Sequence, residues 1–131
     1  MNSLSEQSVL MFAEATGYLT TLERSLKRKS KFNNDLLYNI ISLCTEKLFM
    51  ALLSFRQVNA SHHTPMALYN EAEKLKPMPF HFRETLKLVA RYESICMFDA
   101  FGYKTPDDES MKCMIIGLKD IHDYVQQECA Q

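Results

Sequence analysis

Apolar residues recur every three or four positions through most of this chain, and that spacing predicts amphipathic helices. The first predicted helix runs from about Leu4 to Lys29. Its apolar face is formed by Phe12, Ala15, Leu19, Leu22 and Leu26. Such a face has to pack against other parts of the chain, so this helix is expected to belong to a bundle.

The second predicted helix begins near Asn33 or Asn34, each a suitable N-cap, and runs to Phe55. Its main apolar seam consists of Leu37, Ile41, Cys44, Leu48, Ala51 and Phe55. The seam is widened by Leu36, Ile40, Leu43 and Leu52. A stripe this broad is typical of a helix buried against several neighbours, so we expect it at the centre of the core.

Prolines and capping residues divide the rest of the chain. Residues 56–64 are polar and are expected to form a loop, after which Thr64 and Pro65 fit the N-cap and first position of a short helix ending near Leu75. Its inward residues are expected to be Leu68, Ala72 and Leu75. Pro77 and Pro79 then exclude helix continuation.

Two further helices are predicted after these prolines. The fourth runs from about His81 to Phe98, and Thr105 and Pro106 are expected to cap and open the fifth, which frays near Glu128. The inward residues of the fourth are expected to be Leu86, Val89, Tyr92 and Cys96. Those of the fifth are expected to be Met111, Met114, Leu118, Ile121 and Val125.

Together these segments predict an all-α fold in a single domain covering residues 1–131. No segment shows the period-two alternation of strands, and long helices joined by short connections pack antiparallel. We therefore expect an antiparallel up-and-down four-helix bundle with one short additional helix.

Composition narrows the function classes. With 15 basic and 16 acidic residues, the formal net charge is −1, which gives no global electrostatic case for binding nucleic acid or a membrane. The N-terminal stretch has no basic start and does not fit a secretory signal, and no apolar run is expected to reach the ~20 residues that span a bilayer. The four cysteines form no C-x-x-C pair, which favours reduced thiols in a cytoplasmic protein.

Motifs for cofactors and metals are missing from the sequence. Three glycines cannot supply a glycine-rich phosphate loop, and neither H-E-x-x-H nor a pair of Glu-x-x-His segments occurs. The adjacent His62 and His63 tend to point apart and have no cysteine or carboxylate nearby in sequence to complete a metal site. We therefore expect no cofactor and no metal.

Arg56 with His62 and His63 is the first candidate for chemistry. An arginine fork matches phosphate oxygens, and a histidine transfers protons near neutral pH, so the set contains the minimum for metal-independent RNA cleavage. It also fits a ligand contact without catalysis, or an exposed loop that only leads into the short helix. Arg91 and Tyr92, inside an apolar helix, either bridge to a neighbouring carboxylate or face the same cleft as Arg56.

Three stretches resemble the HEPN domains, small helical bundles often encoded beside minimal nucleotidyltransferases. The helix carrying Cys44–Leu53 is similar to the family's "aEkalKalL" helix, His63–Leu68 to its "tHdL..L" turn, and Leu88–Glu93 to its "aRYp" segment, with Glu93 in place of the proline. The matched region is roughly Leu36–Gln127.

The resemblance implies a bundle that forms a homodimer or joins a nucleotidyltransferase, and that binds nucleotide or RNA. Some members are ribonucleases with an Arg-x4–6-His motif, whose spacing Arg56 and His62 or His63 reproduce. The sequence therefore favours a binding or partner module with Arg56, His62, His63, Arg91 and Tyr92 around one cleft. Its rivals are a metal-independent endoribonuclease using Arg56 and a histidine, and a structural dimerising bundle without a ligand.

Overall fold

In the computed structural model, residues 4–27, 33–98 and 105–130 are described, with the backbone alone for residues 4 and 94–98. This part of the chain is all-helical and has no strand. Its helices are α1 (Leu4–Lys27), α2 (Asn34–Phe55), α3 (Pro65–Leu75), α4 (His81–Phe98) and α5 (Asp108–Cys129). The predicted helices are confirmed, while the expected end of the first, at Lys29, lies outside the described residues.

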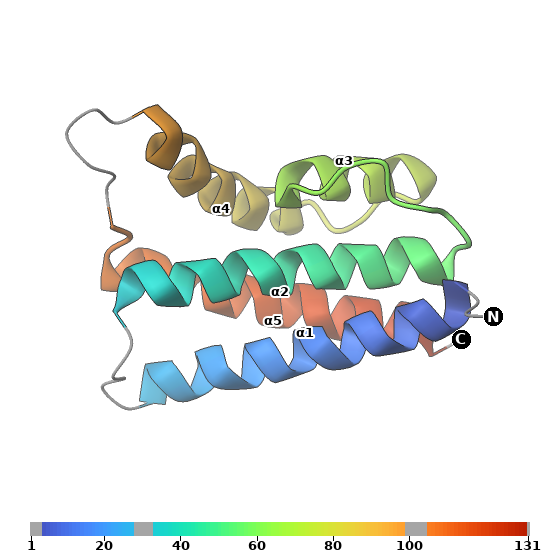
Figure 1. Ribbon diagram of the computed structural model, residues 1–131, viewed down its shortest axis with the longest axis horizontal. Helices are drawn as coiled ribbons and strands as arrows, with labels where there is room; N and C mark the ends of the chain where they lie inside the picture. The colour runs from blue at the N-terminus through green and yellow to red at the C-terminus, as the bar shows by residue number, and fades with distance from the viewer. Residues whose placement is uncertain (1–3, 28–32, 99–104, 131) are drawn as a thin grey trace.

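The long helices α1, α2 and α5 pack along one another, and α3 and α4 cover the opposite side of α2 and α5 (Figure 1). Helix α2 contacts all the others, including α4, where the Tyr38 and Tyr92 rings meet edge to face. Fully buried Ile41, Cys44 and Leu48 lie on its seam. The central position expected for this helix is therefore confirmed.

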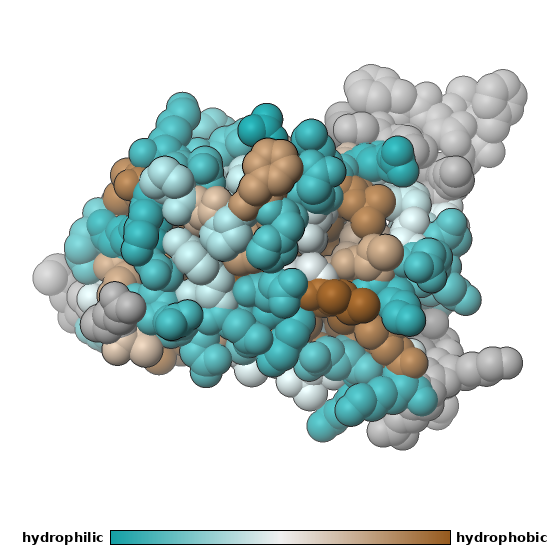
Figure 2. Space-filling model, turned by 180° about the vertical axis from the view of Figure 1, so that it is seen from behind, coloured by the Kyte–Doolittle hydropathy of each residue, from teal (hydrophilic) through white to brown (hydrophobic). Residues whose placement is uncertain are grey.

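Some residues expected in the core lie at the surface. Leu36 is 44% exposed and Leu43 is 42% exposed on α2, and Leu26 and Leu75 are also exposed. Each is at the margin of its helix's apolar stripe, beyond the arc that neighbouring helices cover. On the face seen in Figure 2, hydrophobic residues form small patches separated by hydrophilic ones.

Caps explain where α2 and α5 begin. The Asn33 side chain accepts a hydrogen bond of 2.9 Å from the Leu36 amide, as an N-cap should. At α5 the expected Thr105 cap is wrong, because the Asp107 carboxylate caps the helix with a 2.7 Å bond from the Ser110 amide. The helix consequently begins at Asp108, with an acidic first turn that suits its dipole.

By length and composition α2 is apolar enough to cross a membrane, contrary to the expectation from sequence. The same test is passed by the core helix of many proteins that never meet a bilayer. Here 56% of its most apolar window is buried against other helices, which is the environment of a core helix.

Candidate functional site

The five candidate residues do not gather in one cleft. Tyr92 contacts Tyr38 near the start of α2, whereas Arg56 is the C-cap of the same helix. Tyr38 and Arg56 are 56 − 38 = 18 positions apart, which is about 27 Å along an α-helix. The hypothesis that Arg91 and Tyr92 share a cleft with Arg56 is therefore wrong.

Tyr92 has a structural role in the contact between helices. Its ring is buried against Tyr38 with centroids 5.9 Å apart, and its hydroxyl donates to the Ser110 hydroxyl at 3.0 Å. Tyr38 in turn donates to the Val89 carbonyl of α4. These bonds join α2, α4 and α5, while neighbouring Arg91 is exposed.

The two histidines face different partners. His62 Nδ1 lies 3.0 Å from Glu71 Oε1, and the Ser61 amide donates to both oxygens of that carboxylate at 3.1 Å. The hydrogen bond from His62 is the main reason that the pKa of Glu71 is lowered. His62 therefore anchors the loop to α3 and does not face Arg56's partner.

His63 lies near Glu46, which is one of two neighbouring carboxylates on α2 and α4. Burial raises the pKa of Glu46, while the charges of His63 and Lys47 lower it. Burial, and then the negative charge of Glu46, raises the pKa of Glu93, although a hydrogen bond from Ser42 lowers it. The packing of α4 over α2 is what removes both carboxylates partly from water. No group of three or more histidine, cysteine or carboxylate side chains among the described residues is arranged to hold a metal.

Arg56 belongs to an ion network at the end of the bundle where α2 ends. Its Nη2 lies 2.8 Å from Glu128 Oε1, and Lys76 Nζ lies 2.9 Å from the same oxygen. The hydrogen bond from Lys76, with that from Arg56, lowers the pKa of Glu128. Two cations share one carboxylate, and Arg56 Nη1 is buried without a hydrogen-bond partner. The network therefore has one excess positive charge and an unused donor.

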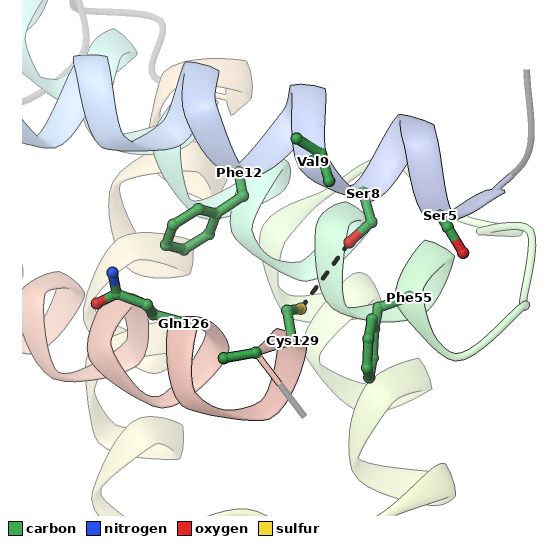
Figure 3. Close-up of a pocket in the computed structure, with 8 residues that line it drawn as sticks. Ser5, Ser8, Val9, Phe12, Phe55, Gln126 and Cys129 are labelled. Atoms are coloured by element: carbon green, nitrogen blue, oxygen red, sulfur yellow. Dashed lines mark hydrogen bonds between the residues drawn. The ribbon is translucent and has the colours of Figure 1, made fainter.

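A cavity of about 360 Å³ lies between the ends of α1, α2 and α5 (Figure 3), and its lining residues Phe55 and Cys129 are the chain neighbours of Arg56 and Glu128. It is lined by Ser5, Ser8, Val9, Phe12, Phe55, Gln126, Cys129 and Ala130. Phe12 points from α1 toward α5, and Phe55 comes from the last position of α2, directly before Arg56. The lining is mainly apolar, with a few polar groups, as in small-molecule sites.

The cavity wall contains two polar groups, the Ser8 hydroxyl and the Cys129 thiol. The Ser8 hydroxyl donates to the Ala51 carbonyl at 2.7 Å and lies 3.9 Å from Cys129 Sγ. Burial raises the pKa of the Cys129 thiol, although Ser8 and the charge of Arg56 lower it. A protonated thiol is a poor nucleophile, so Cys129 serves the cavity as an apolar wall.

A buried histidine supports the Phe12 wall. The His122 and Phe12 rings stack with centroids 4.7 Å apart, His122 Nε2 is 2.9 Å from Thr16 Oγ1, and Nδ1 is 3.1 Å from Asp123 Oδ1. This order of groups resembles a nucleophile–base–acid chain. However, the Thr16 hydroxyl donates its proton to the Phe12 carbonyl at 2.9 Å, so the hydroxyl is not donating to the imidazole. The set fixes Phe12 and does not activate a nucleophile.

The backbone beside Arg56 is held in an unusual turn. The Val58 amide donates to the Leu53 carbonyl at 2.9 Å and the Gln57 amide to the Ser54 carbonyl at 3.0 Å, the two bonds of a Schellman motif. Gln57 takes φ = 64°, a conformation that favours glycine. The motif turns the chain sharply after Phe55 and Arg56, and so fixes both next to the cavity.

Sequence reasoning found Arg56 but missed the cavity. The lining residues come from the first turns of α1 and the ends of α2 and α5, more than 40 positions apart in sequence, and no local motif marks them. No protein-family model matches this chain, and neither does any curated protein or solved structure.

Proposed function

We propose that this chain is a non-catalytic binding module of the HEPN type, and that the cavity beside Arg56 is its ligand site. The ligand is an anion with a flat apolar body, and a nucleotide or a nucleotide at the end of an RNA has this chemistry. A minimal nucleotidyltransferase, which itself handles nucleotides, is the protein partner that the sequence resemblance suggests.

The proposed fold behind this function is an antiparallel up-and-down bundle of α1, α2, α4 and α5, with α3 as the additional helix. Ser8 reaches Ala51, Glu14 pairs with Lys47, and Cys44 donates to the Ala15 carbonyl. Because residue numbers rise on α1 as they fall on α2, these contacts support an antiparallel first pair.

The observation that carries the proposal is the unused donor of Arg56. Arginine binds carboxylate or phosphate through two parallel N–H groups, and here Glu128 occupies Nη2 while Nη1 is buried without a partner. An unsatisfied buried donor costs about 1–3 kcal/mol. Arg56 follows the lining residue Phe55 and does not itself line the cavity, so its side chain has to turn toward a ligand oxygen to recover that penalty.

The cavity suits the rest of such a ligand. A volume of about 360 Å³ lies within the usual range for small-molecule sites. Phe12 and Phe55 offer ring faces or edges to a base, and stacking on an aromatic side chain contributes about 1–3 kcal/mol per base. Lys76, 55% exposed, shares Glu128 with Arg56 and adds a second positive charge beside a bound phosphate.

Calorimetric titration with the four nucleoside monophosphates and with inorganic phosphate tests the proposal. We expect micromolar-to-millimolar binding of at least one nucleotide, weaker binding of phosphate alone, and at least a tenfold loss in Arg56→Met. The matched control is Arg83→Met, which removes an exposed arginine from α4. Lys76→Met, which leaves the Arg56–Glu128 pair in place, gives a second reading if Arg56→Met fails to fold.

Wild-type protein that binds no nucleotide, or equal losses in Arg56→Met and Arg83→Met, would overturn the proposed site. Loss of binding in Arg91→Met instead would move the site to the exposed Arg91.

The ribonuclease alternative requires Arg56 and a histidine on the same phosphate. The contacts favour it less, because Arg56 pairs with Glu128 while His62 pairs with Glu71 and His63 lies near Glu46. An RNA-cleavage assay that compares the wild type with His62→Ala and His63→Ala decides between the ribonuclease and the binding module. Cleavage that is lost in a folded histidine variant would establish the enzyme, whereas a dimer indifferent to nucleotides and RNA would favour the purely structural bundle.

A further inference from the structure

Two glutamates act on each other where the second half of α4 lies over α2. Glu46 on α2 and Glu93 on α4 are both partly buried, and burial is the main cause that raises the pKa of each. The negative charge of Glu46 raises the pKa of Glu93 further. Two neighbouring carboxyls in such a place favour a state with one proton between them, because ionising the second puts like charges side by side.

The surroundings of Glu93 favour its protonated form. Its Oε1 is buried without a hydrogen-bond partner among the described residues, although Ser42 of α2 donates a hydrogen bond to the carboxyl group. A buried carboxylate oxygen that accepts no hydrogen bond is costly when the group is ionised, and costs less in the neutral carboxyl. Glu93 is therefore the member of the pair that carries the proton.

The charges near Glu46 favour its ionised form by comparison. His63, from the loop before α3, and Lys47 on α2 both lower its pKa through their positive charge. The closed arrangement thus has a negative Glu46, between the positive groups and the neutral Glu93.

The start of α5 also contacts this part of α4, through Ser110 and Tyr92. Its carboxylates Asp107 and Asp108 accept hydrogen bonds from the Ser110 amide and from the Asn34 side chain, respectively. Both have donors of their own, and the charge that shifts the pKa of Glu93 comes from Glu46 on α2.

Helix α4 is held differently in its two halves. Its first half packs on α5, where Phe82 meets the Tyr124 ring edge to face and Thr85 lies against Gly117. It packs much less closely on α2 than on α5, and its end stands away from α2 in Figure 1. Contacts of the second half with α2 include the Tyr38 bond to the Val89 carbonyl, the Tyr38–Tyr92 ring contact and the bond from Ser42 to Glu93.

We infer that Glu46 and Glu93 form a proton-dependent latch, which holds the second half of α4 on α2 and releases it when both carboxyls are ionised. Because the pKa of Glu93 is raised by folding, the latch is closed at acidic pH and weakens as the pH rises through the folded-state value. Release uncovers Val89 and Tyr92, which are buried in the closed state. The latch goes beyond the proposed ligand site, which lies at the Arg56 end of α2.

Hydrogen exchange of the full chain, followed by mass spectrometry at pH 5 and pH 8, tests the latch. After correction for the intrinsic exchange rates, we expect peptides covering 89–98 to lose protection at least tenfold at pH 8, while peptides from α1 change much less. Glu93→Gln should remove most of this pH dependence. The matched control is Glu84→Gln, which removes the charge of an exposed carboxylate on the same helix and should leave the pH dependence intact.

Two variants of α2 provide further readings. Glu46→Gln should also reduce the pH dependence, and it keeps the test decisive if Glu93→Gln fails to fold. Ser42→Ala should move the release to higher pH, because the hydrogen bond from Ser42 lowers the pKa of Glu93. Equal protection of 89–98 at both pH values in the wild type, or equal effects of Glu93→Gln and Glu84→Gln, would overturn the inference. So would a loss of protection of the same size in all helices, since the whole chain and not α4 would then be opening.

Discussion

Replacing glycine by alanine should have opposite effects on stability at two positions in helix interiors, Gly17 and Gly117. At Gly117 on α5, a Cβ would lie 2.2 Å from Thr85 Oγ1, 2.7 Å from its Cγ2 and 3.0 Å from its Cβ. Turning the threonine relieves the first two contacts but not the third, so α4 and α5 have to separate slightly. At Gly17 on α1, the same Cβ meets nothing within 4 Å.

The magnitudes follow from these contacts. Overpacking costs typically about 1–3 kcal/mol, and the short contacts at Gly117 put it near the upper end. Replacing a helical glycine by alanine returns about 1 kcal/mol at either site. We therefore expect Gly117→Ala to lower the free energy of unfolding by about 2 kcal/mol and Gly17→Ala to raise it by about 1 kcal/mol.

Urea denaturation followed by circular dichroism measures the free energy of unfolding of both variants. In the Gly117→Ala background, Thr85→Ala should restore part of the lost stability, because it removes two of the three short contacts. Stabilisation by both glycine substitutions, or no response to Thr85→Ala, would refute the close packing of α4 on α5 at this point.

Three other variants test the core, the turn and a half-buried carboxylate. Leu48→Ala should lower the free energy of unfolding by about 2–5 kcal/mol, because Leu48 is fully buried on the central helix. A near-neutral effect in urea titration would contradict the central position of α2 in the core. Gln57→Gly should stabilise by about 0.5–1 kcal/mol, because it relieves a positive φ, and a loss of stability would argue against the turn. Glu93→Gln should raise the melting temperature at pH 7. The folded-state pKa of Glu93 is raised above its unfolded value, so its contribution to stability is present below the unfolded pKa and is lost as the pH rises through the folded pKa. The glutamine variant should therefore lose less stability than the wild type on going from pH 4 to pH 7, and parallel pH profiles would contradict this.

The helices were predictable because their signals are local. Apolar spacing of three and four, Asn33 as a cap and the prolines after α3 each act within one turn of the chain. The start of α5 was misassigned because Thr105 and Asp107 are both good caps, and only the bond to Ser110 shows which is used. Leu36 and Leu43 were placed inward because periodicity gives the width of a stripe but not how much of it neighbours cover.

The candidate site was predictable only in part. Arg56 is conspicuous in the sequence, but its partner Glu128 is 72 positions away and becomes relevant only when α5 returns to the end of α2. The cavity depends on the same topology. Arg91 and Tyr92 were joined to Arg56 by residue type alone, and the length of α2 separates them.

Nuclear magnetic resonance of the labelled chain during titration with the tightest-binding nucleoside monophosphate tests the ligand site most directly. We predict that the largest amide shifts fall on Ser8, Phe12, Arg56 and Cys129, and that Arg91 and its surroundings stay unchanged. Shifts centred on Arg91, or saturating nucleotide without shifts around the cavity, would contradict a binding site at the Arg56 end of the bundle.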